Sequence, residues 1–261
     1  MLQADTWKFT IGWVYPGAID RVLGEFYTMT PQDVNVVLYT KLWALQMVHG
    51  GKFDPAAFGQ QRSEILSSVL ELLQYQDADF IAVSGDLIQS AMGPVWDAEL
   101  RDEISQVAQR PATTAMTAVS DALRALGAES VAVASPFRDD QNEHIRAYLE
   151  AAGFRVASLV GVHTTSIRDI ASLPPTTPLE VAKRAFEAAE APEALYLSCP
   201  VWRGVSQSIE RLEDELGIPV VTMYSPILWK ALITVGYQAE ITGFGKLLST
   251  LPQPRTSDRR A

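Results

Sequence analysis

One thiol is available for chemistry in this chain: Cys199, in the stretch ALYLSCPVWRG at 194–204. It follows an apolar run that is typical of a strand and precedes a turn that contains proline and glycine. A thiol in such a place can give a proton or, as a thiolate, attack a carbonyl carbon. Free cysteine is also one of the residue types most often buried, so packing is the alternative role for Cys199.

A second group with chemical potential is Asp86, which ends the stretch AVSGD at 82–86. Its carboxyl group could act as a general base, or it could cap the following turn. Thr113 and Thr114 could bind a carboxylate or cap the next helix. The three histidines have no ligand spacing with one another or with Cys199, and Gly-rich phosphate-loop patterns are absent. We therefore expect no metal and no cofactor.

Charge and composition limit the partners. The chain has 261 residues, 48% of them hydrophobic, and a formal net charge of −10, which argues against nucleic acid because no basic stripe exists to neutralise phosphates. A single cysteine excludes an intrachain disulfide and suits a reducing compartment. No signal-peptide pattern and no apolar run of about 20 residues is found. We expect a cytoplasmic protein without a membrane partner, and a homo-oligomer remains open.

The elements that must position these groups form an α/β pattern. Short β-branched runs alternate with longer stretches of helical period, as in mainly parallel sheets. Strands are expected at 9–15, 34–39, 79–84, 131–135, 155–159, 194–198 and 219–222. Helices are expected at 57–75, 97–109, 114–126, 140–152, 178–190, 203–216 and 226–235, the fifth with Thr177 as its N-cap.

The chain also repeats itself. AVSGD at 82–86 is followed by an acidic helix and RPATTAMTAVSDALRALG at 110–127, and YLSCP at 196–200 is followed by an acidic helix and IPVVTMYSPILWKALITVG at 218–236. Two related Rossmann-like lobes with a cleft between them are therefore expected, and Gly85 is the counterpart of Cys199. We expect a first lobe from 1–115 plus 225–248, a second from 116–224, and a flexible tail at 249–261.

Two long segments carry a family resemblance. They are PATTAMTAVSDALRALGAESVAVASPFRDDQNEHIRAYLEAAGF at 111–154 and LSCPVWRGVSQSIERLEDELGIPVVTMYSPILWKAL at 197–232. The chain resembles the aspartate/glutamate racemase superfamily, and within it the maleate isomerase and arylmalonate decarboxylase branch. The resemblance implies two pseudo-symmetric α/β lobes with the active site between them.

The same resemblance bears on the acid/base groups. Racemases of the superfamily use two cysteines on opposite faces of the substrate carbon, because inversion takes a proton from one face and returns one to the other. Gly85 occupies the first-lobe position and carries no proton, so a two-thiol racemase is ruled out. The decarboxylases of the branch are similar to this chain, with glycine on one side and one cysteine on the other. The isomerases use a first-lobe cysteine, which is missing here.

The groups that hold the substrate differ from the branch pattern. Decarboxylases of the branch hold the enediolate with hydroxyl residues after the glycine and with a tyrosine, where this chain has Asp86, Leu87 and Phe137. An ionised Asp86 would repel a malonate dianion, and one oxyanion donor is worth about 3–4 kcal/mol. The substrate-binding residues expected from the sequence are Tyr15, Pro16, Gly17, Gly85, Thr113, Thr114, Ser135, Phe137, Trp202 and Thr222.

The resemblance therefore implies a cofactor-independent lyase that decarboxylates a small carboxylate, with protonation by Cys199. Three alternatives stay open at this point. One is a hydrolase of a small amide or imide, with Cys199 as nucleophile and Asp86 as base. The others are a cis–trans isomerase of a small unsaturated diacid and a non-catalytic binder of a small acid.

Overall fold

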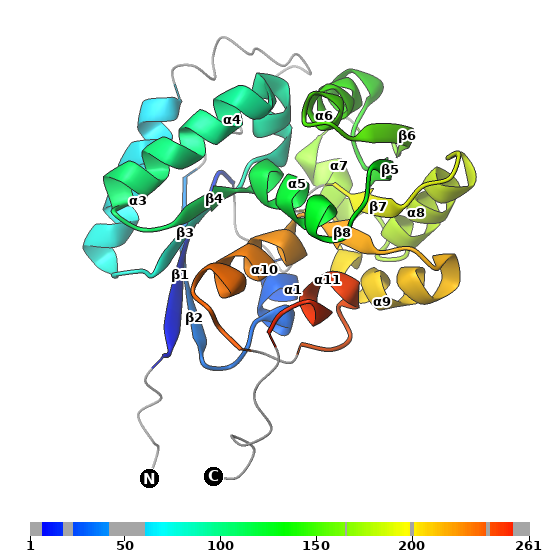
Figure 1. Ribbon diagram of the computed structural model, residues 1–261. Helices are drawn as coiled ribbons and strands as arrows, with labels where there is room; N and C mark the ends of the chain where they lie inside the picture. Colours follow the sequence, from blue (N-terminus) through cyan, green and yellow to red (C-terminus); the bar gives the residue numbers. More distant parts are fainter. Residues whose placement is uncertain are drawn as a thin grey trace, which may run out of the picture.

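The structure is a computed structural model, and it describes residues 7–17, 23–41, 61–164, 166–198, 201–238 and 241–252. Cys199 lies outside the described residues, as do His49 and the last nine residues of the expected tail. Within the described part, strands and helices alternate along the chain and build two lobes (Figure 1).

Each lobe contains one four-stranded parallel sheet. The first sheet has the order β2-β1-β3-β4, and the second has the order β6-β5-β7-β8. The strands are β1 (Phe9–Tyr15), β2 (Val34–Thr40), β3 (Phe80–Val83), β4 (Ala112–Thr114), β5 (Ser130–Ser135), β6 (Arg155–Gly161), β7 (Ala194–Leu197) and β8 (Val220–Thr222). The matching order confirms the predicted α/β fold with two pseudo-symmetric lobes. It also makes β3 and β7 equivalent strands.

The strands form where the sequence is continuously apolar. Every residue of β1, β3, β5 and β7 is buried, as expected for parallel strands that are covered on both faces. The helices are α1 (Leu23–Met29), α3 (Arg62–Tyr75), α4 (Asp86–Ala108), α5 (Ala115–Ala125), α6 (Asp139–Ala151), α7 (Ile167–Ser172), α8 (Thr177–Glu187), α9 (Val205–Leu216), α10 (Tyr224–Thr234) and α11 (Gly245–Ser249).

Three local predictions were wrong. The helix expected at 97–109 begins eleven residues earlier, at Asp86, and is kinked at Gly93, whose φ is 82°, just before Pro94. Residues 112–114 form the edge strand β4, where no strand was expected, because pairing with β3 decides the conformation of so short a segment. The N-cap of α8 is Thr176 and not Thr177, with no hydrogen bond from its side chain.

Helices α5 and α10 join the two lobes. In Figure 1 they lie between the two sheets, and α10 contacts α5, β3 and β4 as well as β8. Helix α10 thus follows the last strand of the second sheet but packs on the first. This packing supports the proposed division into 1–115 with 225–248 and 116–224, which remains a proposal.

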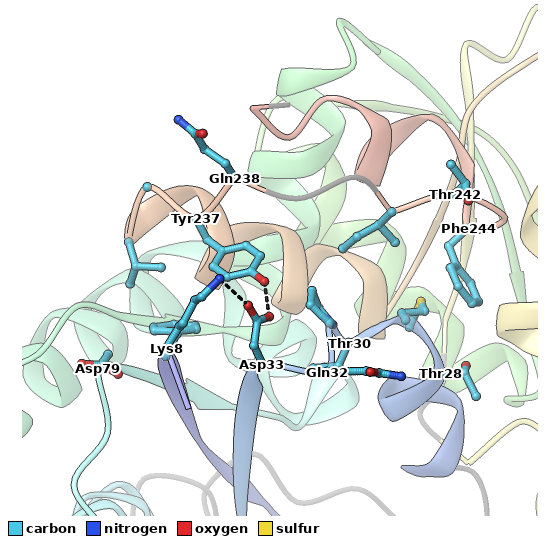
Figure 2. A pocket seen from close by; sticks show the side chains of 16 residues that line it. Lys8, Thr28, Thr30, Gln32, Asp33, Asp79, Tyr237, Gln238, Thr242 and Phe244 are labelled. Atoms are coloured by element: carbon cyan, nitrogen blue, oxygen red, sulfur yellow. Dashed lines mark hydrogen bonds and ion pairs between the residues drawn. The ribbon is translucent and has the colours of Figure 1, made fainter. Parts of the chain in front are cut away.

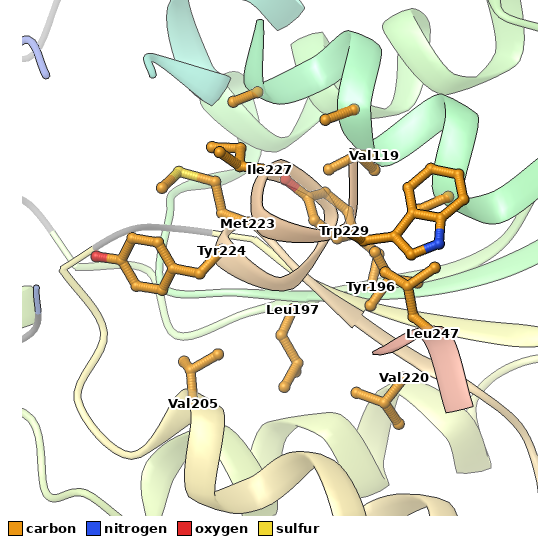
Figure 3. Close-up of a cluster of buried hydrophobic side chains, with 14 of the residues drawn as sticks. Val119, Tyr196, Leu197, Val205, Val220, Met223, Tyr224, Ile227, Trp229 and Leu247 are labelled. Atoms are coloured by element: carbon orange, nitrogen blue, oxygen red, sulfur yellow. The ribbon is translucent and has the colours of Figure 1, made fainter. Parts of the chain in front are cut away.

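One hydrophobic core runs through both lobes. Figure 3 shows part of this core, to which Leu197 of β7, Val205 of α9, and Tyr224 and Ile227 of α10 contribute. The ring of Tyr224 packs edge-on against Trp13 of the first lobe, with 5.8 Å between the ring centroids. Trp13 also donates from Nε1 to the Ser84 hydroxyl over 2.7 Å, which fixes the end of β3. Side chains from both lobes therefore pack together at the carboxyl end of β3. None of the described helices is both long enough and apolar enough to cross a membrane.

Candidate active site

The carboxyl ends of β3 and β7 define the candidate site. Ligands of open α/β sheets bind beyond the carboxyl ends of the strands, where the strand order reverses. Gly85 follows β3 at that point, and a Cβ built on Gly85 would lie 3.6 Å from Cγ of Pro16, which follows β1. The ends of β1 and β3 are thus in contact at the predicted position.

The backbone at Gly85 requires glycine. Its φ is 128°, a value that residues with a side chain rarely adopt, although a Cβ would meet its nearest neighbour, Ile88, at an ordinary 3.4 Å. The restriction at this position is therefore conformational and not a matter of space. The same restriction disfavours cysteine at the first-lobe position.

Substituting Gly85→Ala should lower the free energy of unfolding by about 1–3 kcal/mol, the usual cost of forcing a side chain into such a conformation. Urea unfolding of the purified variant measures this. Gly24→Ala is the matched control: Gly24 is exposed in α1, and a Cβ there would have nothing within 4 Å. That change should be neutral or stabilising, and an equal loss at both positions would contradict the conformational explanation.

Asp86 connects the two strand ends. It lies in the first turn of α4 and is only 3% exposed. The hydroxyl of Ser198, the residue before Cys199, donates to Asp86 Oδ2 over 2.9 Å. The structure thereby brings the residue after Gly85 next to the residue before Cys199. The predicted pairing of Gly85 and Cys199 is consistent with this contact, although Cys199 itself is not described.

Two residues that follow Cys199 in the chain, Val201 and Trp202, are also buried. Val201 is 8% exposed and Trp202 is fully buried. The indole Nε1 of Trp202 has no hydrogen-bond partner among the described residues. On the other side of the site, the backbone of Gly17 lies against the ring of Tyr15, where a Cβ would come within 3.0 Å of Cε1. Tyr15 and Phe137 are each 4% exposed, so these two rings and Trp202 belong to the buried core, and their contact with a substrate stays a prediction.

The predicted hydroxyl donors are engaged with the protein itself. Thr114 caps α5 by accepting from the N–H of Thr117, and Thr113 donates to the Thr114 carbonyl over 3.1 Å. Ser135 donates to Asn142 and accepts from the N–H of Phe137. Thr222 accepts at 3.1 Å from the N–H groups of both Tyr224 and Ser225. These four side chains hold the junctions between strands and helices, so their first role is to shape the site.

The sequence analysis did not identify Glu25, which connects the two lobes at the start of α9. Glu25 lies in α1 and is 8% exposed. The N–H of Gly204 donates to its Oε1 over 2.6 Å, and the N–H and hydroxyl of Ser206 donate to its Oε2 over 2.9 and 2.7 Å. Glu25 thus satisfies backbone donors at the start of α9 from the other lobe. A partner nearly 180 residues away leaves no local pattern in the sequence.

A second missed group is Asp97, which is fully buried behind Thr114. Its Oδ2 accepts from the hydroxyl of Thr117 on α5 over 2.9 Å and from that of Tyr148 on α6 over 2.7 Å. Burial raises the pKa of Asp97, and the hydrogen bonds from Thr114, Tyr148 and Thr117 oppose that rise only in part. Asp97 therefore links α4, α5 and α6. Its burial costs more free energy when the carboxyl group is ionised than when it is protonated.

Because the pKa of Asp97 is higher in the folded than in the unfolded chain, its contribution to stability is complete at low pH and is lost as the pH rises through the folded value. Compared with Asp97→Asn, the wild type should therefore lose free energy of unfolding as the pH rises. The loss should be about 1.4 kcal/mol for each unit by which folding raises the pKa of Asp97. Thermal unfolding of wild type and Asp97→Asn at pH 4 and pH 8 measures it. Parallel pH profiles would refute the assignment, and Asp102→Asn, an exposed change on the same helix, is the control.

A cavity of about 1000 Å³ lies at the opposite end of the first sheet. Figure 2 shows Lys8, which precedes β1, in an ion pair of 2.9 Å with Asp33, which also accepts from the hydroxyl of Tyr237. Lys8 and Asp33 directly precede β1 and β2, at the amino ends of these strands, whereas Gly85 and Asp86 follow the carboxyl end of β3. The cavity is therefore distinct from the candidate site. Among the described residues, no group of three or more His, Cys, Asp or Glu side chains could hold a metal ion.

The two lobes, with facing strand ends that carry glycine in one lobe and lead to cysteine in the other, define the two-lobed fold of the aspartate/glutamate racemase superfamily. Residues 43–248 match the arylmalonate decarboxylase family (Amdase). The chain belongs to this family, as the resemblance predicted, and its homologues are enzymes.

Curated relatives include both reaction types of the predicted branch. The chain is 31% identical to the arylmalonate decarboxylase of Bordetella bronchiseptica over 176 residues, which are 67% of this chain and 73% of that protein. It is 29% identical to the maleate isomerase of Nocardia farcinica over 131 residues, half of this chain and 51% of that protein. A solved structure of arylmalonate decarboxylase superposes with a TM-score of 0.76 at 26% identity, covering 92% of this chain and 99% of the other. The protein is thus a decarboxylase or an isomerase of this family.

Proposed function

We propose that this protein is a cofactor-independent decarboxylase of a small carboxylate, in which Cys199 protonates the carbon that has lost CO2. The observation that carries the proposal is the pair of equivalent strand ends. The end of β3 presents Gly85, which has no proton to give, and the end of β7 leads directly to the only cysteine. One proton donor on one face is sufficient for a decarboxylase and insufficient for a racemase.

The reaction balances with one thiol. The bond between the α-carbon and the leaving carboxylate breaks, and its electron pair stays on the α-carbon, delocalised into the remaining acyl group. The S–H proton of Cys199 then moves to that carbon, and the thiolate recovers a proton from solvent. Because the nearby hydroxyls already bond to the protein, we infer that backbone N–H groups near Gly17 and Gly85 hold the developing negative charge.

The substitutions in one solved structure of a relative support a functional role for this glycine and cysteine pair. One solved form of arylmalonate decarboxylase has a glycine replaced by cysteine and a cysteine replaced by serine. Those two positions are separated by the same number of residues as Gly85 and Cys199 in this chain. By contrast, one solved form of the Nocardia farcinica maleate isomerase carries a succinylcysteine while another cysteine is replaced by serine. That enzyme therefore has two cysteines where this chain has one, which favours decarboxylation over isomerisation.

The test is a screen of the wild-type protein for CO2 release from small malonates and malonate half-amides, with maleate and cyclic imides alongside. We expect CO2 from a malonate-type compound and no reaction with the others. Conversion of maleate to fumarate without CO2 would make the protein an isomerase. Opening of an imide ring would make it a hydrolase.

A further inference from the structure

The chain just before Gly85 is held by β1. The indole of Trp13 donates to the hydroxyl of Ser84 over 2.7 Å, and the N–H of Ser84 donates to the Val14 carbonyl over 3.0 Å. Ser84 is only 1% exposed, so both bonds lie in the interior. The backbone that enters the Gly85 turn is therefore fixed on the side of β1.

Gln89 makes a second connection to this turn. It lies in α4, four residues after Gly85, and is only 2% exposed. Its Nε2 donates to the Val83 carbonyl over 3.1 Å, and its Oε1 accepts from the backbone N–H of Met116 over 3.1 Å. One buried amide thus joins the end of β3 to the start of α5. The connection requires a side chain that has both a donor and an acceptor.

The same connection reaches the strand that leads to the cysteine. The sulfur of Met116 accepts from the hydroxyl of Tyr196 over 3.7 Å. Tyr196 lies in β7, three residues before Cys199. The ends of β3 and β7 are therefore linked through Gln89 as well as through the hydrogen bond of Asp86.

We propose that Gln89 is a positioning residue: by holding the end of β3 against α5, it keeps the backbone N–H of Gly85 directed at the charge that develops on the substrate. This inference rests on the proposed decarboxylation. Gly85 has no side chain to anchor its own turn, and glycine has the greatest backbone freedom of any residue. A donor that is already in place needs no reorganisation during the reaction, and a misplacement of about 1 Å can slow an enzyme about 10²-fold.

The test compares two substitutions at Gln89 with the same two at Gln106, an exposed residue of the same helix. Gln89→Leu removes both hydrogen bonds and keeps the approximate size. Its kcat for CO2 release should fall about tenfold or more, with KM changed less than about threefold. Gln106→Leu and Gln106→Glu should stay within about twofold of wild type.

Gln89→Glu separates positioning from packing. The new side chain can still accept from Met116, but when ionised it cannot donate to the Val83 carbonyl. Protonation restores the donor, and burial raises the pKa of a carboxyl group at such a position. The kcat of Gln89→Glu relative to wild type should therefore rise as the pH falls, whereas the relative kcat of Gln89→Leu should not change with pH.

Two results would overturn the inference: a kcat of Gln89→Leu within about twofold of wild type, or a relative kcat of Gln89→Glu that does not rise toward low pH. Both leave the proposed decarboxylation intact, because the wild type still releases CO2.

If the wild type releases no CO2 from any compound, the decarboxylation fails and amide hydrogen exchange decides whether Gln89 holds the end of β3. Exchange at Ser84 should be about tenfold faster in Gln89→Leu than in wild type, with exchange in β5 unchanged. Equal acceleration at both places, or none at Ser84, would refute the role of Gln89.

Discussion

Replacing Cys199 with alanine is expected to lower the rate of product formation by about 10³-fold or more. Proton transfer by a positioned side chain contributes roughly 10²–10⁴-fold to an enzymatic rate, and this chain has no second thiol to substitute for Cys199. Cys199→Ser should be nearly as slow, because a serine hydroxyl is a far weaker acid than a thiol. The rate of CO2 release under saturating substrate measures both effects.

Val201→Ala is the matched control for packing near Cys199. Val201 is buried two residues later and has no proton to give, so its truncation should cost stability and leave kcat within about tenfold of wild type. A Cys199→Ala protein that remains as active as wild type would assign protonation to another group. A comparable loss of kcat in Val201→Ala would mean that packing alone explains the effect.

The largest effect on stability is expected from Glu25→Ala, which should lower the free energy of unfolding by about 3–5 kcal/mol. The change removes the acceptor for two backbone N–H groups and one hydroxyl that are buried at the start of α9. Each buried donor left without a partner costs about 1–3 kcal/mol. Urea unfolding monitored by circular dichroism measures the loss.

Two further variants test whether the loss of stability depends on the charge of Glu25 and on its position in the fold. Glu25→Gln keeps one acceptor oxygen and should lose less than half as much stability as Glu25→Ala. Glu210→Ala, an exposed change on α9 itself, should stay within about 0.5 kcal/mol of wild type. If Glu25→Ala unfolds like Glu210→Ala, Glu25 does not hold the two lobes together at α9.

Sequence reasoning succeeded where one physical signal dominated. The buried strands of parallel sheets are continuous apolar runs, so β1, β5 and β7 could be located within one residue of their observed ends. The repeat then made the ends of β3 and β7 equivalent, which is how Gly85 and Cys199 came to be paired. The strand order of the two sheets confirms that the two halves are related.

The features that sequence reasoning missed depend on distant partners. Strand β4 has three residues and forms by pairing with β3, and its own sequence is too short to specify a strand. Gly93 and Pro94 interrupt the regular helical backbone, and α4 continues beyond this kink to Ala108. Glu25 and Asp97 each find partners on other helices, and an acidic residue in a polar stretch is normally exposed. Their roles became visible only from the three-dimensional arrangement.

The most direct test of the central claim, protonation of one face by one thiol, is the stereochemistry of the product formed in deuterated water. A malonate with two different substituents on its α-carbon, which is prochiral, is converted to completion in D2O, and the product is analysed by mass spectrometry and chiral chromatography. We predict one deuteron at the α-carbon and a single enantiomer. A racemic product would place proton donors on both faces, and a product without deuterium, with an acyl group trapped on Cys199, would make the thiol a nucleophile and contradict the account.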